Sequence, residues 1–323
     1  MKALVTGATG FVGSHLAEAL RRHAHEVTAL VRSPEKAKAL AGQGVRVMPG
    51  DLLHEPAALE RAVQGKDIVY HVAGLVAARN EAAFLRGNCD GTRNILAAAE
   101  RHGKPRFVLI SSLAAGGPAA RGVPLAGGET PNPVTAYGRS KLAAERAVAG
   151  SSLRWSIVRP PIVYGPRDRE ILKVFRLARL GIAPIFGDGA QELSAVHAVD
   201  LAEALVAVGE SPATIGGIYP ACHPEVFTTL EFGRAIGAAM GRTVASVRIP
   251  AGLGRAVLSV TEMAARLTGQ VTILTSDKAN EFFQPAWTGD PAPLTRDSGW
   301  QAAYDLKSGL ADTYDWYRRA GWL

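Results

Sequence analysis

The sequence predicts an α/β fold in which a doubly wound parallel sheet is followed by a smaller, mostly helical module. Two observations predict this fold. Short apolar runs rich in β-formers alternate with amphipathic helical patterns through the first half of the chain. The pattern then loosens after Arg159-Pro160, where pairs containing Gly and Pro interrupt it. A length of 323 residues suits one large domain or two fused modules.

Six apolar runs are expected to form the strands, each followed by a helix. In chain order they are Ala3 to Val5, Val27 to Val31, Val45 to Met48, Ile68 to Val72, Phe107 to Ile110 and Trp155 to Val158. Repeated strand-helix units imply a parallel sheet covered on both faces. In such sheets the ligand binds at the carboxyl ends of the strands, so functional residues are expected directly after each run.

The second half is expected to contain helices near 199–210 and 229–240. The predicted division places one domain at 1–165, which also receives segments from about 193–222, and a substrate-binding module at 166–323. Residues 247–275 are apolar but interrupted by charges, such as Arg255 and Glu262. This pattern favours an amphipathic helix packed on the protein over one inserted in a membrane.

Composition excludes several classes of protein. The 36 basic and 29 acidic residues give a net charge of +7, yet the basic residues form no stripe suited to nucleic acid. Cys89 and Cys222 are the only cysteines, too few for a disulfide framework or a CxxC site. The first residues lack the apolar run of a signal peptide. We therefore expect a cytoplasmic protein that binds neither nucleic acid nor membrane.

A glycine-rich turn follows the first run. Gly7, Gly10 and Gly13 have the GxxGxxG spacing between a strand and a helix, with Thr9, Phe11 and Val12 completing the segment. Such glycines allow a tight turn, close approach of the backbone to a pyrophosphate and close helix packing. The sequence thus predicts a Rossmann-type fold that binds a dinucleotide.

The next turns specify the cofactor further. Arg32 follows the second run, where binders of the unphosphorylated cofactor usually have a carboxylate. An arginine there grips a 2′-phosphate, so NADP is preferred over NAD, the alternative being a solvent-facing side chain. Asp51-Leu52 and Ala73 follow the third and fourth runs and are expected at the cofactor, although Asp51 equally suits a helix cap.

Tyr137 and Lys141 are expected to form the centre of the catalytic site. They lie four residues apart at the start of a predicted helix, hence on one face. A lysine ammonium beside a phenol lowers the pKa of the phenol, which suits proton exchange with a substrate oxygen. Ser111 and Ser112 end the fifth run at the same sheet edge, where a hydroxyl can bind that oxygen.

With these elements in this order, the sequence resembles the short-chain dehydrogenase/reductase superfamily, in particular its extended epimerase/dehydratase branch. The branch is indicated by TGATGFVG, by Asp67 to Ala73, by Asn88-x-x-Gly91-Thr92, by Arg159-Pro160-x-x-Val163-Tyr164-Gly165-Pro166 and by Trp316-Tyr317. The resemblance implies that Ser112 orients the substrate oxygen, Tyr137 is the acid/base, and Lys141 binds the nicotinamide ribose and tunes Tyr137. It also implies that Pro160 and Val163 line the nicotinamide pocket.

The substrate is expected to be an apolar carbonyl compound. Ile162 and Leu193 stand where sugar-processing members commonly have Asn and Arg for a sugar diphosphate, and Leu113-Ala114-Ala115 replaces the carboxylates of dehydratases. The chain thus resembles reductase-like members such as flavonoid ketone reductases and 3β-hydroxysteroid dehydrogenases.

We therefore expect an NADP(H)-dependent oxidoreductase that interconverts a carbonyl and a secondary alcohol. The alternatives are a nucleotide-sugar epimerase of the same fold and a non-catalytic NADP-sensing regulator. The family's four-helix interface implies a homodimer through helices near 92–102 and 137–149. The eight histidines form no metal motif, and His197 is expected to be structural. The natural substrate and the reaction direction stay undetermined by sequence.

Overall fold

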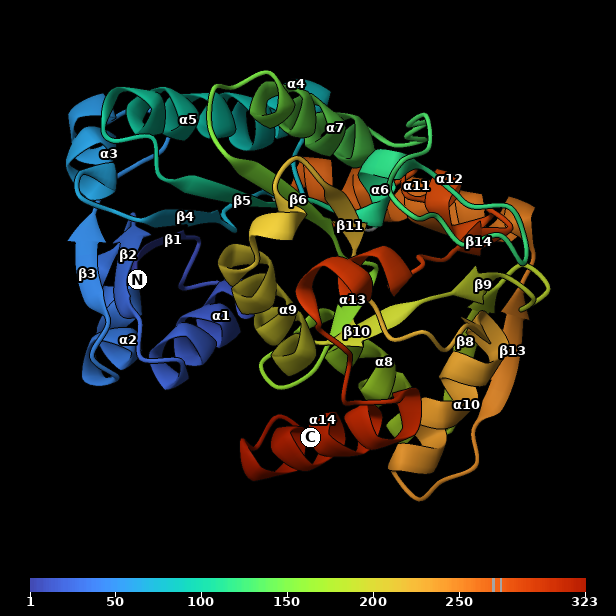
Figure 1. Ribbon diagram of the computed structural model, residues 1–323. Coiled ribbons are helices and arrows are strands. Elements are labelled where there is room, and N and C mark those ends of the chain that lie inside the picture. Colours follow the sequence, from blue (N-terminus) through green and yellow to red (C-terminus); the bar gives the residue numbers. More distant parts are fainter. Residues whose placement is uncertain (269–270, 274) are drawn as a thin grey trace.

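The computed structural model describes residues 1–268, 271–273 and 275–323. Its centre is a seven-stranded parallel sheet with the order β11-β6-β5-β4-β1-β2-β3 (Figure 1). The strands are β1 (Lys2–Thr6), β2 (Glu26–Val31), β3 (Arg46–Pro49), β4 (Ile68–His71), β5 (Arg106–Ile110), β6 (Trp155–Arg159) and β11 (Ile218–Pro220). The predicted α/β class and the six predicted strands are confirmed. The seventh strand comes from much later in the chain.

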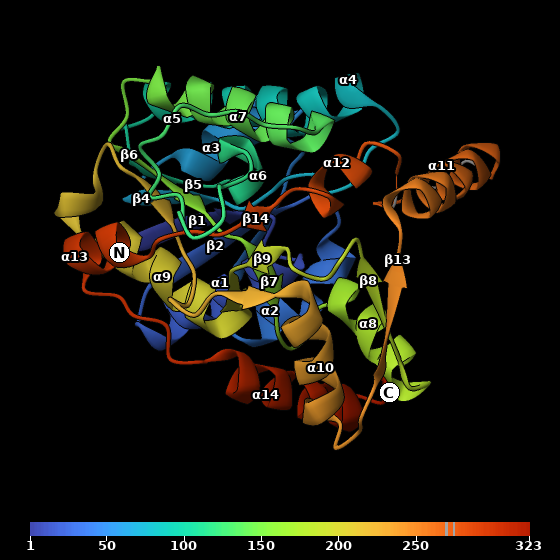
Figure 2. The ribbon, with the colours of Figure 1, turned by 90° about the vertical axis from the view of Figure 1, so that its right-hand side faces the viewer.

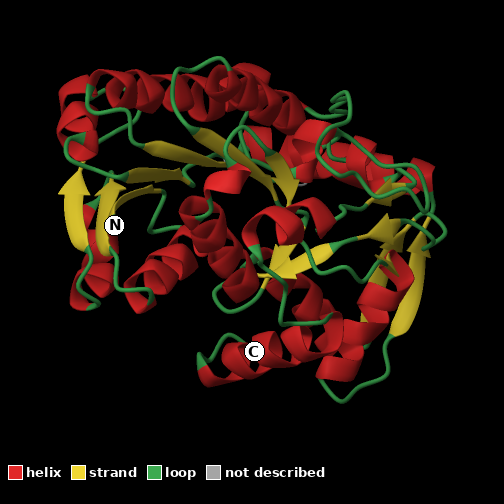
Figure 3. Cartoon of the chain, in the orientation of Figure 1, coloured by secondary structure: helices red, strands yellow, loops and turns green. Residues whose placement is uncertain are grey.

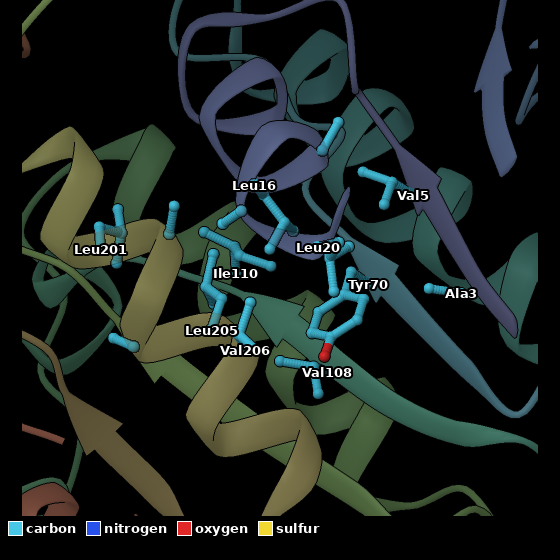
Figure 4. Packing of buried hydrophobic residues seen from close by; sticks show 14 of the residues in the cluster. Ala3, Val5, Leu16, Leu20, Tyr70, Val108, Ile110, Leu201, Leu205 and Val206 are labelled. Carbon is cyan, nitrogen blue, oxygen red and sulfur yellow. The ribbon is translucent and has the colours of Figure 1, made fainter. Parts of the chain in front are cut away.

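Helices cover both faces of the sheet, as Figures 1 and 3 show. One face is covered by α1 (Phe11–Arg22) and α9 (Ala198–Glu210), the other by α3 (Pro56–Val63), α5 (Gly91–Arg101) and α7 (Ala136–Ala149). Successive side chains of β1 point to opposite faces of the sheet, so Ala3 and Val5 belong to one core cluster and Leu4 to the other. Figure 4 shows the first cluster, where Leu16 and Leu20 of α1 and Leu201 and Leu205 of α9 pack together over the same face of the sheet.

The strand order reverses beside β1, which pairs with β2 on one side and β4 on the other. At such a point the connections after the two neighbouring strands run to opposite faces of the sheet. They leave a crevice at the carboxyl ends of the strands, and ligands bind there. Shorter elements fill the connections: η1 (Pro34–Ala37), α2 (Lys38–Gly42), α4 (Glu81–Phe84), the π-helix η2 (Leu85–Asp90), α6 (Leu113–Gly116) and η3 (Pro212–Thr214).

The rest of the chain packs around a third core cluster. This cluster includes residues of α8 (Glu170–Arg179), α10 (Thr229–Ala239) and α14 (Leu306–Arg319). The module also has short strands, more than the mostly helical prediction suggests: β7 (Ile162–Tyr164) pairs with β10 (Ala195–His197), β8 (Ile182–Phe186) with β13 (Ala245–Ile249), and β9 (Glu192–Leu193) with β12 (Phe227–Thr228) and β14 (Ala286–Trp287). Its other helices are α11 (Ala251–Leu267), α12 (Ala279–Phe282) and α13 (Ala292–Ser298).

The expectation for residues 247–275 is corrected in one respect. The segment contains the end of β13 and the amphipathic helix α11, but much of the apolar side of α11 is exposed and only Gly254 and Leu258 of its described side chains are buried. The part of this stretch at 269–270 and 274 lies outside the described residues. Within the described chain, no helix is both long and apolar enough to cross a membrane.

Candidate active site

The glycine-rich turn connects β1 to α1 at the point where the strand order reverses. Gly7 has φ +72°, and a Cβ there would meet the Ala73 nitrogen at 2.6 Å. A Cβ on Gly13 would meet the Gly7 carbonyl oxygen at 2.2 Å. Both positions therefore require glycine for the fold itself, because the turn presses against the end of β4 and against α1.

Gly10 differs from the other two glycines. Its φ of −84° suits any residue, and an added Cβ would have a single neighbour within 4 Å, the Gly7 oxygen at 3.2 Å. Thr9 and Gly10 are exposed, while Phe11 and Val12 are partly so, and no side chain caps α1. The open backbone and the positive end of the helix dipole fit the pyrophosphate of a nicotinamide dinucleotide.

Arg32 directly follows β2, at the carboxyl edge of the sheet. Its side chain is exposed and makes no hydrogen bond or ion pair with the described residues. A free guanidinium at this position is available to a phosphate on the adenosine ribose. The structure thus leaves both alternatives for Arg32 open.

Asp51 is engaged locally in the turn before α3. Its Oδ1 accepts hydrogen bonds from the backbone N–H groups of Leu53 at 2.7 Å and His54 at 3.2 Å. Partial burial acts to raise the pKa of Asp51, but these hydrogen bonds outweigh it and the pKa is lowered. The Leu52 carbonyl accepts a hydrogen bond from Asn94. The carboxylate therefore supports the turn before α3 but does not cap that helix, whose N-cap is Glu55.

Ala73 is held at the glycine turn by a buried network that the sequence did not predict. Its N–H donates to Thr6 Oγ1, which lies 2.7 Å from His71 Nδ1, and His71 Nε2 lies 3.0 Å from Thr92 Oγ1. Burial lowers the pKa of His71 to about 3. A neutral ring that accepts from Thr6 and donates to Thr92 satisfies every group, since Thr92 itself donates to the Asn88 carbonyl.

Ser112 and Tyr137 come together where β5 ends and α7 begins. Thr135 caps α7 by accepting from the Gly138 N–H, which places Tyr137 in the first turn. Ser112 caps α6 by accepting from the Ala114 N–H, and its side chain lies near enough to Tyr137 to act on the pKa of the phenol. Ser111 is buried, whereas Ser112 is partly exposed. The structure therefore favours Ser112 over Ser111 as the serine able to contact a substrate.

The expected effect of Lys141 on Tyr137 is not what the structure shows. Burial raises the pKa of Tyr137 to about 12, and the nearby Ser112 only partly opposes this shift. Lys141 Nζ instead donates to the Ile110 carbonyl at 2.6 Å. Burial lowers the pKa of Lys141 to about 8, while the nearby Glu145 acts to raise it. Lysine and tyrosine share a helix face, but the ammonium is directed at the sheet.

Glu145 is a residue that sequence reasoning missed. One helical turn beyond Lys141, it forms a bidentate ion pair with Arg159, with distances of 2.9 Å from Nε to Oε1 and 2.7 Å from Nη2 to Oε2. Both side chains are buried. The pair fixes α7 against the end of β6, and the i, i+4 spacing from Lys141 was the available signal.

The segment after β6 passes the same edge of the sheet. Pro160 is buried and Val163 is partly buried against the first core cluster. Ile162 and Leu193 pack with the third core cluster, and Leu113, Ala114 and Ala115 are buried in α6. These aliphatic residues therefore contribute to packing. The expected substrate class follows from the polar side chains that sugar-processing relatives have at these positions and this chain lacks.

The C-terminal module completes the surroundings of Tyr137. The Ala136 N–H donates to Asp277 Oδ2 at 2.8 Å, and Thr135 Oγ1 donates to Glu281 Oε1 at 2.9 Å. The rings of Phe84 and Tyr137 lie 5.9 Å apart. No sequence motif announced Asp277 or Glu281, because their partners are distant in the chain.

The fold and the site define a nicotinamide-dependent oxidoreductase. Residues 3–221 match the model of the NAD dependent epimerase/dehydratase family, and the chain belongs to this family, within the extended short-chain dehydrogenase/reductase superfamily.

Three known proteins illustrate the relationship. The chain is 33% identical over 320 residues to a ceramide reductase of Caulobacter vibrioides, covering 99% of this chain and 95% of the relative. It is 29% identical over 328 residues to a 2-alkyl-3-oxoalkanoate reductase of Stenotrophomonas maltophilia, covering 96% and 97%. The solved structure of MoeE5 in complex with UDP-glucose and NAD is 25% identical, with a TM-score of 0.79 and 99% of each chain covered.

Proposed function

We propose that the protein is an NADPH-dependent reductase that converts the ketone of an apolar, alkyl-chain substrate into a secondary alcohol. The observation that carries this proposal is the placement of Tyr137 near Ser112, which acts to lower the pKa of the phenol, at the sheet edge that bears the glycine turn. A phenol with a pKa of about 12 keeps its proton at neutral pH and suits the role of a proton donor to a forming alkoxide.

The residues have distinct roles in this reaction. A reduced nicotinamide, when bound, supplies the hydride to the carbonyl carbon. Ser112 donates a hydrogen bond to the carbonyl oxygen, and Tyr137 transfers its proton to that oxygen, so that one hydride and one proton complete the alcohol. Lys141, with a pKa of about 8, is mostly protonated near neutral pH and serves to bind the nicotinamide ribose.

The cofactor preference rests on Arg32. The guanidinium is exposed and free of contacts with the described residues, and it follows β2, where a carboxylate would favour the ribose hydroxyls of NAD. The remaining cofactor contacts are proposed for the glycine turn, Leu52 and Ala73, with Pro160 and Val163 beside the nicotinamide. The role of Asp51 in this set is support of the neighbouring turn.

The substrate class rests on the reductase relatives. Ceramide and 2-alkyl-3-oxoalkanoate are both substrates with alkyl chains, and the relatives so named span nearly the whole chain. The second candidate, a nucleotide-sugar epimerase, is favoured by the likeness to MoeE5, which binds UDP-glucose and NAD. A non-catalytic NADP sensor is less favoured, because Ser112, Tyr137 and Lys141 are all present.

The assembly and location are inferred from two further features. The helices α5 and α7 lie side by side over the same face of the sheet (Figure 1), as a four-helix dimer interface requires. Cys89 and Cys222 are free and buried, which suits the reducing cytoplasm. We infer a cytoplasmic homodimer, and light scattering of the purified protein measures its mass directly.

The decisive experiment follows NADPH absorbance while the protein is incubated with alkyl ketones and, separately, with sugar nucleotides, with product analysis in parallel. We expect steady NADPH loss with an alkyl ketone. Tyr137→Phe keeps cofactor binding and loses turnover by on the order of a hundredfold or more, because the proton donor is removed. Inversion of a sugar nucleotide without net absorbance change would establish the epimerase instead.

A further inference from the structure

The helix α11 presents an apolar surface that the rest of the described chain leaves uncovered. Gly254 and Leu258 are buried, and Gly254 lets the helix approach the rings of Phe283 and Phe186 closely. These contacts fix which side of α11 faces the protein. The side turned away consists of apolar residues, all exposed: Leu253, Ala256, Val257, Val260, Met263 and Ala264. This set is called the α11 apolar face below.

The position of α11 connects this face to the site. Figure 2 shows the helix at the outer edge of the molecule, reached from β13 and projecting beside α12. Glu262 of α11 accepts hydrogen bonds from Ser276, and Arg255 lies 3.5 Å from Asn280 of α12. The next contacts inward are those of Asp277 with Ala136 and of Glu281 with Thr135, one and two residues before Tyr137.

The charges around the face are arranged asymmetrically. The three carboxylates of the segment 245–285 are Glu262, Asp277 and Glu281, and all of them accept hydrogen bonds from protein groups. Arg248 and Arg255, in contrast, are exposed. On α11, Arg255 and Ser259 lie on the strip between the buried side and the apolar face. The exposed charges near the apolar face are therefore those of arginines, with the Arg255 guanidinium also lying 5.5 Å from the centroid of the Phe283 ring.

An apolar helix face bordered by arginine suits the boundary between the headgroups and acyl chains of a bilayer. Anionic headgroups attract the arginines, and the apolar side chains leave water by entering the acyl boundary. We propose that α11 docks the protein on an anionic lipid bilayer, so that a substrate dissolved in the membrane reaches Tyr137. This proposal departs from the sequence-based expectation of no membrane partner, and it places the protein at the bilayer surface and not across it. The substrate-delivery part rests on the proposed reductase function.

The test is co-sedimentation of the full chain with vesicles of phosphatidylcholine alone and of phosphatidylcholine containing phosphatidylglycerol. Val260, 68% exposed on the α11 apolar face, is compared with Leu180, 72% exposed after α8 at the far end of β8 and β13. We expect binding to the anionic vesicles, about tenfold weaker binding for Val260→Glu, and no change for Leu180→Glu. Circular dichroism of both variants confirms that they are folded.

Two further readouts separate the possible outcomes. If the wild-type protein stays in the supernatant with anionic vesicles, or if Val260→Glu and Leu180→Glu bind equally, docking through α11 is wrong. If Val260→Glu instead changes the mass in solution while vesicles are not bound, the face covers a second copy. Vesicle binding by a protein that reduces no ketone would overturn the reductase proposal and leave docking intact. With a short water-soluble ketone, Val260→Glu and wild type should have equal rates.

Discussion

At the scale of single residues, Tyr137 retains its proton because its environment disfavours the phenolate. Its pKa rises to about 12 through burial, and the ammonium of Lys141 is hydrogen-bonded to the Ile110 carbonyl instead. A protonated phenol is ready to donate a proton to a substrate oxygen. The phenolate-stabilising role expected for Lys141 would require its ammonium to turn toward Tyr137.

Replacement of Arg32 tests the cofactor preference. Arg32→Ala should weaken NADPH binding by about tenfold to a hundredfold, because charge-assisted hydrogen bonds to a phosphate contribute about 1.5–3 kcal/mol each. Binding of NADH should change by less than about twofold, since that cofactor lacks the 2′-phosphate. Fluorescence titration of both cofactors measures the two constants.

A matched control for Arg32 is Arg46, which is also exposed but lies at the start of β3, away from the carboxyl edge. Arg46→Ala removes the same charge from the protein and should leave both constants unchanged. Equal losses of NADPH affinity in the two variants would show that only net charge matters, and an unaltered constant in Arg32→Ala would refute the preference for NADP.

Several site residues could be predicted because local spacing determines their neighbours. The three glycines and the Tyr137–Lys141 pair depend on the periods of a turn and a helix. Glu145 and Asp277 could not be predicted in the same way. Their partners, Arg159 and Ala136, are brought to them by the packing of separate elements.

At the scale of elements, two glycines at the start of α1 have different roles: Gly13 is needed for packing, whereas Gly10 is expected to leave space for the cofactor. Gly13→Ala should destabilise the protein, because its Cβ would lie 2.2 Å from the Gly7 carbonyl oxygen. Gly10→Ala should leave the melting temperature within a few degrees of wild type while NADPH affinity falls by about tenfold or more, because the methyl group occupies the open side of the turn.

Thermal unfolding and cofactor titration of the two glycine variants check this difference. The Gly10→Ala protein serves as the control for Gly13→Ala, since both add one methyl group to the same turn. A large loss of stability in Gly10→Ala, or unchanged NADPH binding in that folded variant, would show that the exposed turn does not receive the pyrophosphate.

The strands of the sheet were predictable and the environment of α11 was not. A buried parallel strand has a continuous apolar sequence, and all six such runs form strands. Residues 251–267 show helical amphipathicity equally well, but periodicity does not distinguish a face buried in the protein from one left outside. The segment expected to return to the first domain, about 193–222, contains α9 and β11, but its short apolar run at Ile218–Pro220 did not by itself mark a strand.

At the scale of the whole molecule, buried histidines should make stability depend on pH. Burial lowers the pKa of His197 to about 4, and that of His15, beside Arg167, also to about 4. Between these values and the unfolded value near 6.5, the unfolded chain binds more protons, so the free energy of unfolding falls as pH decreases. The slope is about 1.4 kcal/mol per pH unit for each such group.

The variant His197→Phe should reduce this dependence. The buried ring lies 5.5 Å from the Tyr164 ring and 4.1 Å from the Tyr304 ring between centroids, and phenylalanine keeps this packing. The substitution removes the titrating Nε2, which lies 3.4 Å from Asp312 Oδ2. Between about pH 7 and about pH 5, the variant should lose about 2 kcal/mol less than wild type in urea unfolding. An identical pH dependence in the variant and the wild type would exclude His197 as a contributor.

The hydrogen bond between Ala136 and Asp277 also has a consequence for synthesis. The two residues are 141 positions apart, so the ribosome translates the tyrosine-bearing helix long before the carboxylate that caps it. At about 5–20 residues per second, the interval is on the order of ten seconds. A nascent chain therefore holds Ser112, Tyr137 and Lys141 for that time without the Asp277 contact at the start of α7, and the proposed reducing activity is expected to begin only near the end of translation.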